Sequence, residues 1–219
     1  MVYLPWKKHL HPSIELIPVE LSGRGSRFAT PFYESFDAAI NDIYDLIQKK
    51  IENSRYALLG HSMGSWLVYE LAYMIAERNQ SQPVHLFLSG RYPPYLQKEM
   101  KISHDLPEAE LKAQLMEMGG TPVELLENDE FLNLFMPVLR ADYKILETYQ
   151  YSPKSYQLGC AITSFTGSQD EIVTIEELQL WQESSSQVCR SYELEGGHFF
   201  LHEKTSEIAR IINDTLVVG

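Results

Sequence analysis

The feature that most constrains this chain is the pentapeptide Gly60-His61-Ser62-Met63-Gly64, which lies where an apolar run turns into a helical pattern. The run YALLG at 56–60 reads as a short buried strand, and the helical pattern begins at about residue 63. A serine at such a junction occupies a strained turn, for which the glycines two residues before and after it leave room. Its hydroxyl then stands clear of the sheet, beside a helix N-terminus that favours a developing oxyanion. The motif predicts that Ser62 is a nucleophile and that the Met63 N–H is an oxyanion donor.

A serine hydroxyl needs a general base at neutral pH. His198 stands out among the seven histidines because it follows a predicted strand, in the loop Gly196-Gly197-His198. The two glycines give the backbone freedom to turn the imidazole back over the sheet. His61 adjoins the serine but is expected to leave the turn on its other side, where packing is its simplest role. The other histidines, expected to be structural or exposed, are His9, His11, His85, His104 and His202.

The base needs a carboxylate to fix its tautomer and stabilise its charged form. Asp170 follows the apolar run CAITSFTG at 160–167, at the carboxyl end of a predicted strand. Glu171 is the neighbouring alternative, and Asp142 is a further competitor. The order Ser62, Asp170, His198 is that of α/β-hydrolases. These residues together predict acyl transfer through a covalent acyl-serine.

Short β-rich runs alternate with longer helical patterns, which is typical of a mainly parallel sheet flanked by helices. We therefore predict a single α/β-hydrolase domain over 1–219. From about 103 to 150 the alternation fails, and three helical segments follow one another at 104–120, 121–135 and 136–151. Such an insertion is typical of a lid, although a plain extra helical layer is the alternative. The expected strands are 14–20, 56–60, 84–90, 160–167 and 187–196, and the expected helices outside the insertion are 36–52, about 63–79, 175–184 and 203–217.

Composition excludes several classes of protein. The formal charge of −12 argues against nucleic acid or an anionic membrane as the main partner. No apolar run is long enough to span a membrane, and the first twenty residues do not resemble a signal peptide, so we expect a cytoplasmic protein. Cys160 and Cys189 have no metal-ligand spacing and are expected to be reduced thiols. No metal site is predicted.

Several further motifs resemble those of the type II thioesterases that accompany polyketide and non-ribosomal peptide assembly lines. The resemblance runs over essentially the whole chain. The segments that carry it are YLPW at 3–6, LSGRGSR at 21–27, GHSMG at 60–64, LSGR at 88–91, MGGTP at 118–122, PVLRADY at 137–143, GSQD at 167–170 and GGHFFL at 196–201.

This resemblance implies hydrolysis of thioesters on carrier-protein phosphopantetheine arms, which removes misprimed or stalled acyl groups. Acyl or peptidyl carrier proteins would be the partners, and the arm would belong to the carrier, so no cofactor is expected. It also implies that the insertion is a mobile lid over an acyl channel. A monomer is expected, because no large apolar repeat suggests self-association. The candidate channel residues, for which simple lid packing is the alternative, are Met116, Met118, Leu134, Phe135 and Met136.

The chain also departs from the pattern of that family. Relatives have a further strand and a Pro-aromatic-x-Gly-Gly loop ahead of the region matching Tyr3, and that loop donates a second oxyanion N–H. No equivalent precedes Tyr3 in this sequence. On the resemblance, we expect the first strand and the oxyanion loop to be missing from this chain.

Three other functions fit the same motifs. A carboxylesterase or lipase would use the same triad on oxygen esters. A carrier-binding module without turnover would fit a chain that has no second oxyanion donor. An acyltransferase also uses G-H-S-x-G, but the pairing of Asp170 with His198 weighs against it. Five basic residues could form a patch that docks the carrier protein, or they could be scattered charges in contact with solvent. These residues are Lys7, Lys8, Arg24, Arg27 and Arg91.

Overall fold

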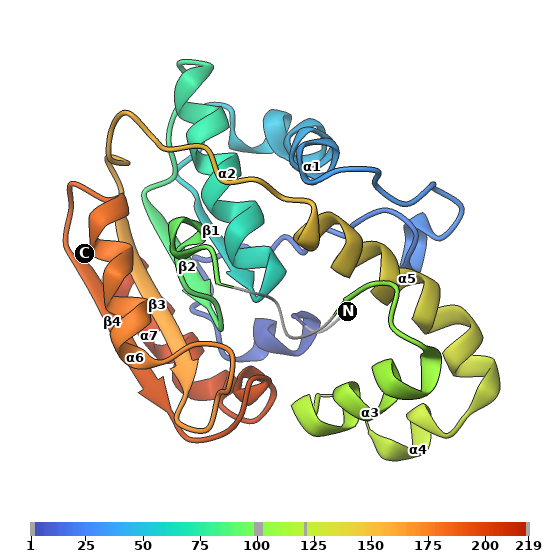
Figure 1. The fold of residues 1–219 in the computed structure, drawn as a ribbon. Helices are drawn as coiled ribbons and strands as arrows, with labels where there is room; N and C mark the ends of the chain where they lie inside the picture. Colours follow the sequence, from blue (N-terminus) through green and yellow to red (C-terminus); the bar gives the residue numbers. More distant parts are fainter. Residues whose placement is uncertain (1–2, 99–102, 121, 218–219) are drawn as a thin grey trace.

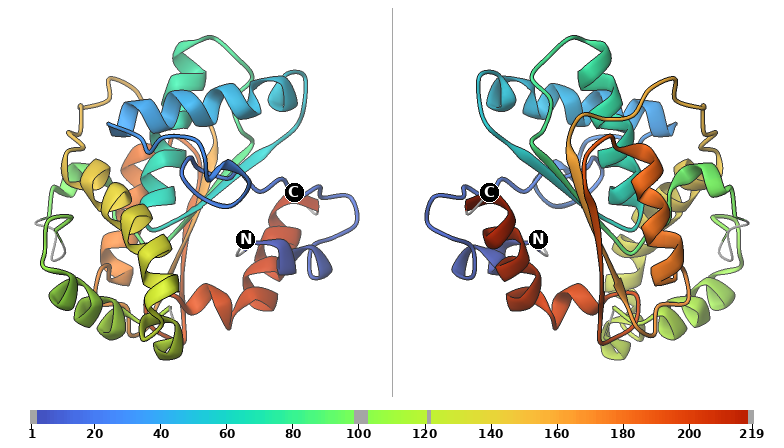
Figure 2. Two further views of the ribbon diagram at one scale, coloured as in Figure 1. Left: turned by 90° about the vertical axis from the view of Figure 1, so that its right-hand side faces the viewer. Right: turned by 90° about the vertical axis from the view of Figure 1, so that its left-hand side faces the viewer.

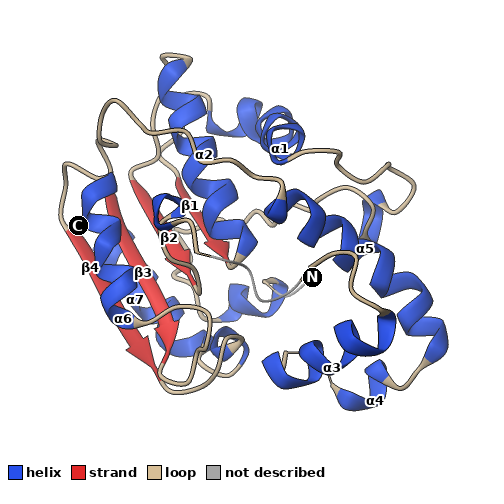
Figure 3. Ribbon diagram, in the orientation of Figure 1, coloured by secondary structure: helices blue, strands red, loops and turns tan. Residues whose placement is uncertain are grey.

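A four-stranded parallel sheet forms the centre of the molecule (Figures 1 and 3). The structure is a computed structural model that describes residues 3–98, 103–120 and 122–217. The sheet order is β1-β2-β3-β4, and each neighbouring pair is parallel, so all carboxyl ends lie at one edge. The predicted, mainly parallel sheet flanked by helices is confirmed. The strands are β1 (Ala57–His61), β2 (His85–Ser89), β3 (Ala161–Gly167) and β4 (Cys189–Leu194).

Helices cover both faces of this sheet, and the side chains of each strand point alternately toward one face and the other. In β2, Leu86 and Leu88 join one core cluster, whereas Phe87 joins another on the opposite face. The helices of the first face are α1 (Phe36–Ile51), α2 (Met63–Glu77) and α6 (Ile175–Gln179). The second face is covered by α7 (Thr205–Val217) and by the 3₁₀ turn η1 (Leu4–Lys8), which lie side by side in Figure 2.

Local sequence signals explain the helix positions well. Ser35 accepts a hydrogen bond of 3.1 Å from the Ala38 N–H and so caps α1, which begins at residue 36 as predicted. The buried stripe of α1 repeats at helical spacing toward α2. The predicted helix at 175–184 is the α-helix α6 followed by the 3₁₀ turn η4 (Leu180–Ser184).

The insertion at 103–150 is helical, as predicted, and stands beside the sheet with an apolar cluster of its own (Figure 1). Its helices are α3 (Glu108–Met118), α4 (Val123–Leu126) and α5 (Asp129–Glu147). The expected break between 135 and 136 is wrong, because α5 continues through Pro137. Its strongly amphipathic face, with Leu132 and Met136 buried, holds the helix together across that proline. Tyr143 packs against both the lid cluster and the main core.

The predicted strand at 14–20 is wrong. The segment has no regular secondary structure, although its residues alternate between half-buried and exposed as they would in a strand. Leu16 packs on the second core cluster while Ile17 is exposed. The alternating pattern therefore determined which side chains point inward, but a strand also requires a hydrogen-bonded neighbour.

Two predictions from composition were also tested. Cys160 and Cys189 are both free, as expected, and burial raises the pKa of the Cys160 thiol to about 11. Within the described ranges, no helix is long and apolar enough to cross a membrane.

Candidate active site

Ser62 sits in the strained turn that its sequence predicts, between β1 and α2. Its backbone has φ 53° and ψ −117°, a conformation that non-glycine residues rarely adopt. The Ser62 N–H donates to the Ser89 carbonyl at 2.7 Å. The buried Ser65 hydroxyl bonds the carbonyls of Gly60 and Ser89, each at 2.9 Å. These bonds tie the turn to β2 and keep Ser62 in place despite the strain.

The two glycines of the motif are not equivalent. A Cβ built on Gly60 would overlap the Gly64 backbone carbonyl, so this position requires glycine. A Cβ built on Gly64 would meet no atom within 4 Å. The close approach of the end of β1 to the first turn of α2 explains why residue 60 is glycine. No contact among the described residues explains why residue 64 is glycine.

Asp170 and His198 form a buried pair at the carboxyl ends of β3 and β4. The His198 Nδ1–H donates to Asp170 Oδ2 at 2.9 Å, and their side chains are 3% and 0% exposed. The other Asp170 oxygen accepts from the Ile172 N–H at 2.8 Å. A Cβ on Gly167 would overlap the carbonyls of Gly196 and Gly197, so the two loops can meet only through that glycine. This arrangement fixes the tautomer that leaves Nε2 as the acceptor.

The competing carboxylates lie elsewhere. Glu171 is exposed. Asp142 forms a bidentate ion pair with Arg24, at 2.6 and 2.8 Å, which joins α5 to the loop at 21–27. The carboxylate hydrogen-bonded to His198 is therefore that of Asp170.

His198 and the Ser62 turn meet at Gly90. A Cβ at residue 90 would lie 2.7 Å from the His61 Cε1 and 3.0 Å from the His198 Cε1. The His198 Nε2 is buried and has no hydrogen-bond partner within 3–98, 103–120 and 122–217, so it makes no bond to the Ser62 Oγ here. Such catalytic hydrogen bonds often form only with substrate present.

His61 has a more specific environment than packing alone, which the sequence did not reveal. Its ring centroid lies 4.9 Å from that of His198, and its Nδ1 hydrogen-bonds the Ser89 hydroxyl at 2.9 Å. Burial, with smaller effects from His198 and His202, lowers the pKa of His61 well below its usual value. His61 is therefore a neutral neighbour of the histidine that binds Asp170.

The helical insertion contacts the loop that carries His198. A Cβ on Gly120, just after α3, would overlap the ring of Phe199, which follows His198. The five candidate channel residues are placed differently. Met136 is buried within the lid cluster, Met118 and Phe135 pack at its edge, and Met116 and Leu134 are 38% and 59% exposed. Met118 also accepts a sulfur hydrogen bond from the Tyr143 hydroxyl at 3.8 Å. Their roles in a channel stay a prediction.

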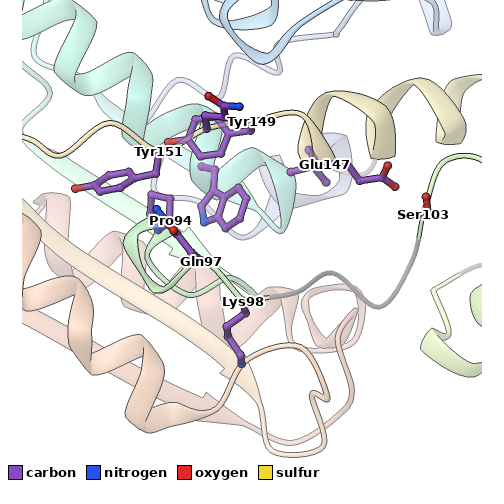
Figure 4. Close-up of a pocket in the computed structure, with 10 residues that line it drawn as sticks. Pro94, Gln97, Lys98, Ser103, Glu147, Tyr149 and Tyr151 are labelled. Carbon is purple, nitrogen blue, oxygen red and sulfur yellow. The ribbon is translucent and has the colours of Figure 1, made fainter.

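A hollow of about 630 Å³ opens between the core and the end of α5 (Figure 4). Aromatic rings from Trp66, Tyr149 and Tyr151 form much of its wall. Trp66 is one helical turn beyond Ser62, the N-cap residue of α2, so the hollow lies beside the helix that begins at Ser62.

The cations considered for a docking patch do not act alike. Arg24 pairs with Asp142, and Arg27 pairs with Asp42 at 2.6 Å. Arg91 is buried at 5% exposure. Lys7 and Lys8 are exposed. No common basic surface results from these five residues.

Comparison with known proteins shows the family to which this chain is similar. A family model described as "Thioesterase domain" matches residues 1–216. The linear gramicidin dehydrogenase LgrE of Brevibacillus parabrevis is 36% identical over 98% of this chain and 82% of the relative. The crystal structure of ClbQ from the colibactin NRPS/PKS pathway superimposes with a TM-score of 0.93 at 30% identity, and covers 100% of this chain and 93% of that one. BorB, a type II thioesterase from the borrelidin biosynthetic cluster, gives 0.86 at 30% identity over 97% and 85%.

Proposed function

The chain belongs to the thioesterase domain family, and on that premise we propose that Ser62, His198 and Asp170 hydrolyse acyl groups from the phosphopantetheine thioesters of assembly-line carrier proteins. The similar protein BorB is a type II thioesterase of a biosynthetic cluster, and ClbQ belongs to an NRPS/PKS pathway, which supports a role in editing or release. The observation that carries the triad is the buried hydrogen bond from His198 to Asp170 beside the strained Ser62 turn.

In the first half of the proposed reaction, the Ser62 Oγ attacks the thioester carbonyl carbon while the His198 Nε2 takes its proton. Asp170 holds the imidazole in place and stabilises the imidazolium that forms. The carbonyl oxygen becomes an oxyanion, to which the Met63 N–H donates. Met63 opens α2, where backbone N–H groups have no partner within the helix. Collapse of this intermediate breaks the C–S bond, and the imidazolium gives its proton to the departing sulfur, which leaves as the thiol.

In the second half, a water molecule attacks the acyl-serine while His198 accepts its proton. The new oxyanion occupies the same position, and its collapse breaks the bond between the acyl carbon and the Ser62 Oγ. The imidazolium gives its proton to that oxygen, so a carboxylic acid leaves and the Ser62 hydroxyl is regenerated. Each step uses the same three side chains, so atoms and protons balance without a cofactor.

The experiment that tests this function measures hydrolysis of a short acyl group on a phosphopantetheinylated carrier, next to the matched oxygen ester. Wild type should cleave the thioester, and Ser62→Ala should lose that turnover. A faster oxygen-ester reaction would favour the carboxylesterase alternative. Binding of the acyl carrier without any turnover would favour a carrier-binding module.

A further inference from the structure

His61 is a half-buried histidine that the proposed reaction does not use. Its ring centroid lies 4.9 Å from that of His198, with an angle of 40° between the two ring planes. The ring of Phe199 lies beside both, with its centroid 5.7 Å from that of His61 and 5.0 Å from that of His198. These distances are typical of packed rings, so the three side chains form one group around the proposed base.

Asp170 fixes the His198 imidazole at one atom only. The bond from the Nδ1–H to Asp170 leaves the ring free to tilt about that atom, and a tilt displaces the Nε2 on the far side of the ring. The Nε2 has no hydrogen-bond partner among residues 3–98, 103–120 and 122–217, so no bond at that end opposes the tilt. The rings packed beside His198 therefore limit its orientation.

Ser89 anchors the His61 ring and the Ser62 turn at the same time. The His61 Nδ1 and the Ser89 hydroxyl form a hydrogen bond of 2.9 Å, and the Ser89 carbonyl accepts the Ser62 N–H at 2.7 Å. Ser89 is the last residue of β2, is 5% exposed and lies in register between β1 and β3. One well-fixed residue therefore holds the backbone of the nucleophile and the ring that packs on the base.

The next residue, Gly90, lets the two imidazoles meet. Both Cε1 atoms lie within 3.0 Å of the point that a Cβ at residue 90 would occupy. Gly90 has a φ of +66°, and its N–H donates to the Phe165 carbonyl at 2.8 Å, so the backbone is held in this conformation. The contact between His61 and His198 therefore follows from the backbone at the end of β2.

We propose that His61, anchored by Ser89, is a positioning residue that holds the His198 imidazole at the angle from which its Nε2 reaches the Ser62 Oγ. The inference rests on the proposed function and adds to it a residue that acts through His198. Because Ser89 also binds the Ser62 N–H, the base and the nucleophile keep their relative position. The alternative is that His61 and Ser89 only stabilise the end of the sheet.

A second histidine of the sheet supplies a matched control. His85, the first residue of β2, bonds the Thr163 hydroxyl at 2.8 Å, so it makes the same kind of bond at the opposite end of the strand from Ser89. The test variants are Ser89→Ala, which removes the hydroxyl, His61→Phe, which keeps a ring that cannot bond, and the double variant. The control variants are Thr163→Val, His85→Phe and their double variant.

Ser89→Ala and His61→Phe should each slow single-turnover acylation of Ser62 by an acetylated carrier protein by about 10-fold or more, because the base is misplaced. The double variant should be no slower than His61→Phe, since both changes remove the same bond. Affinity for the acetylated carrier, measured with Ser62→Ala added, should stay within about threefold. The control variants should lose thermal stability but acylate within about threefold of wild type. Equal rate losses in the controls, additive losses in the double variant, or a loss in affinity alone would overturn the inference.

A measurement without substrate separates this inference from the proposed function. Exchange of the His198 Nδ1–H with water, followed by NMR, should be slow in wild type, because its bond to Asp170 is buried. Ser89→Ala should speed this exchange by about 3- to 10-fold, the usual effect of losing one hydrogen bond, and Thr163→Val should not. Unchanged exchange in Ser89→Ala would refute the positioning role even if wild type hydrolyses thioesters. Absence of all wild-type hydrolysis would count against the proposed function alone. If His61→Phe fails to fold, Ser89→Ala, which removes a single oxygen atom, decides both measurements.

Discussion

Gly120 and Phe199 touch across the boundary between the helical insertion and the loop that carries His198, so closely that any side chain at residue 120 would overlap the Phe199 ring. Gly120 also has a φ of +84°, and its neighbour Gly119 has a φ of +71° with no atom of the described residues within 4 Å of its Cβ position. Both glycines therefore need a positive φ, but only Gly120 lies against Phe199. Replacing each glycine in turn separates the effect of backbone strain from the effect of the Phe199 contact.

Gly120→Ala should lower kcat/KM by about tenfold or more, because it displaces either the lid or the ring next to His198. Gly119→Ala is the matched control, with backbone strain of about 1–2 kcal/mol and a smaller effect on rate. Steady-state kinetics and thermal unfolding of both variants would check this. Equal rates in the two variants would show that the Phe199 contact has no role in turnover.

Asp170→Asn should reduce kcat by about 10⁴-fold while thioester binding is retained, because an amide donates to the Nδ1 and favours the wrong imidazole tautomer. Glu171→Gln is the adjacent control and should stay within a few-fold of wild type, since Glu171 is exposed. Single-turnover acylation rates would measure both. A near-normal rate in Asp170→Asn would return the acid role to Glu171 or Asp142.

Gly60→Ala should destabilise the protein by about 3 kcal/mol or more, because its Cβ would overlap the Gly64 carbonyl in a turn that cannot widen. Gly64→Ala should be neutral or stabilising by up to about 1 kcal/mol, since its Cβ meets open space in a helix. Urea unfolding of the two variants tests this asymmetry. A large loss in Gly64→Ala would mean that the open space is filled in solution.

Stability should fall as the pH drops below about 6.5, because buried His61 and His85 resist protonation in the folded state. Desolvation and the nearby Arg190 lower the pKa of His85 to about 4, and the pKa of His61 is also lowered. Both depressed pKa values mean that the unfolded chain binds these protons first, so stability present above pH 6.5 is lost on acidification. His85 should contribute about 1.5 kcal/mol of loss between pH 6.5 and 5, and His61 should add to this loss in the same direction.

His85→Gln keeps a polar partner for Thr163, whose hydroxyl bonds the His85 Nε2 at 2.8 Å. This variant should lose the part of the pH-dependent change that His85 contributes, about 1.5 kcal/mol between pH 6.5 and 5. Urea midpoints at several pH values between 5 and 7 would show it. An unchanged slope in His85→Gln would place the effect at other groups.

The Arg24–Asp142 ion pair should hold α5 against the core, because it is bidentate and partly buried, with the two side chains 27% and 20% exposed. Asp142→Asn should speed hydrogen exchange in α5 by about 3- to 30-fold, which corresponds to about 1–2 kcal/mol of local opening. The Arg27–Asp42 pair anchors α1 instead, so Asp42→Asn should leave exchange in α5 unchanged. Exchange measured by mass spectrometry on both variants distinguishes these cases.

Local sequence determined much of this protein. The strained serine turn follows from a glycine, a serine and the start of a helix within a few residues, since the steric requirement is itself local. The cap at Ser35 and the apolar stripe of α1 likewise depend on near neighbours, and so predicted the helix correctly. Even the run at 14–20, which is not a strand, has the alternation of inward and outward side chains that its residues indicate.

Tertiary structure decided what depends on distant partners. A strand at 14–20 would need a hydrogen-bonded neighbour, which no periodicity can supply. The choice of Asp170 over Asp142 depended on which carboxylate the fold brings to His198, and Arg24 is the partner that holds Asp142 elsewhere. Arg91 is buried against Trp66, and this contact between the end of β2 and α2 exists only in the folded chain. The sequence analysis therefore considered Arg91 only as an exposed cation. Local sterics act over a few residues and can be predicted from them, whereas pairing and burial belong to contacts that exist only after the chain has folded.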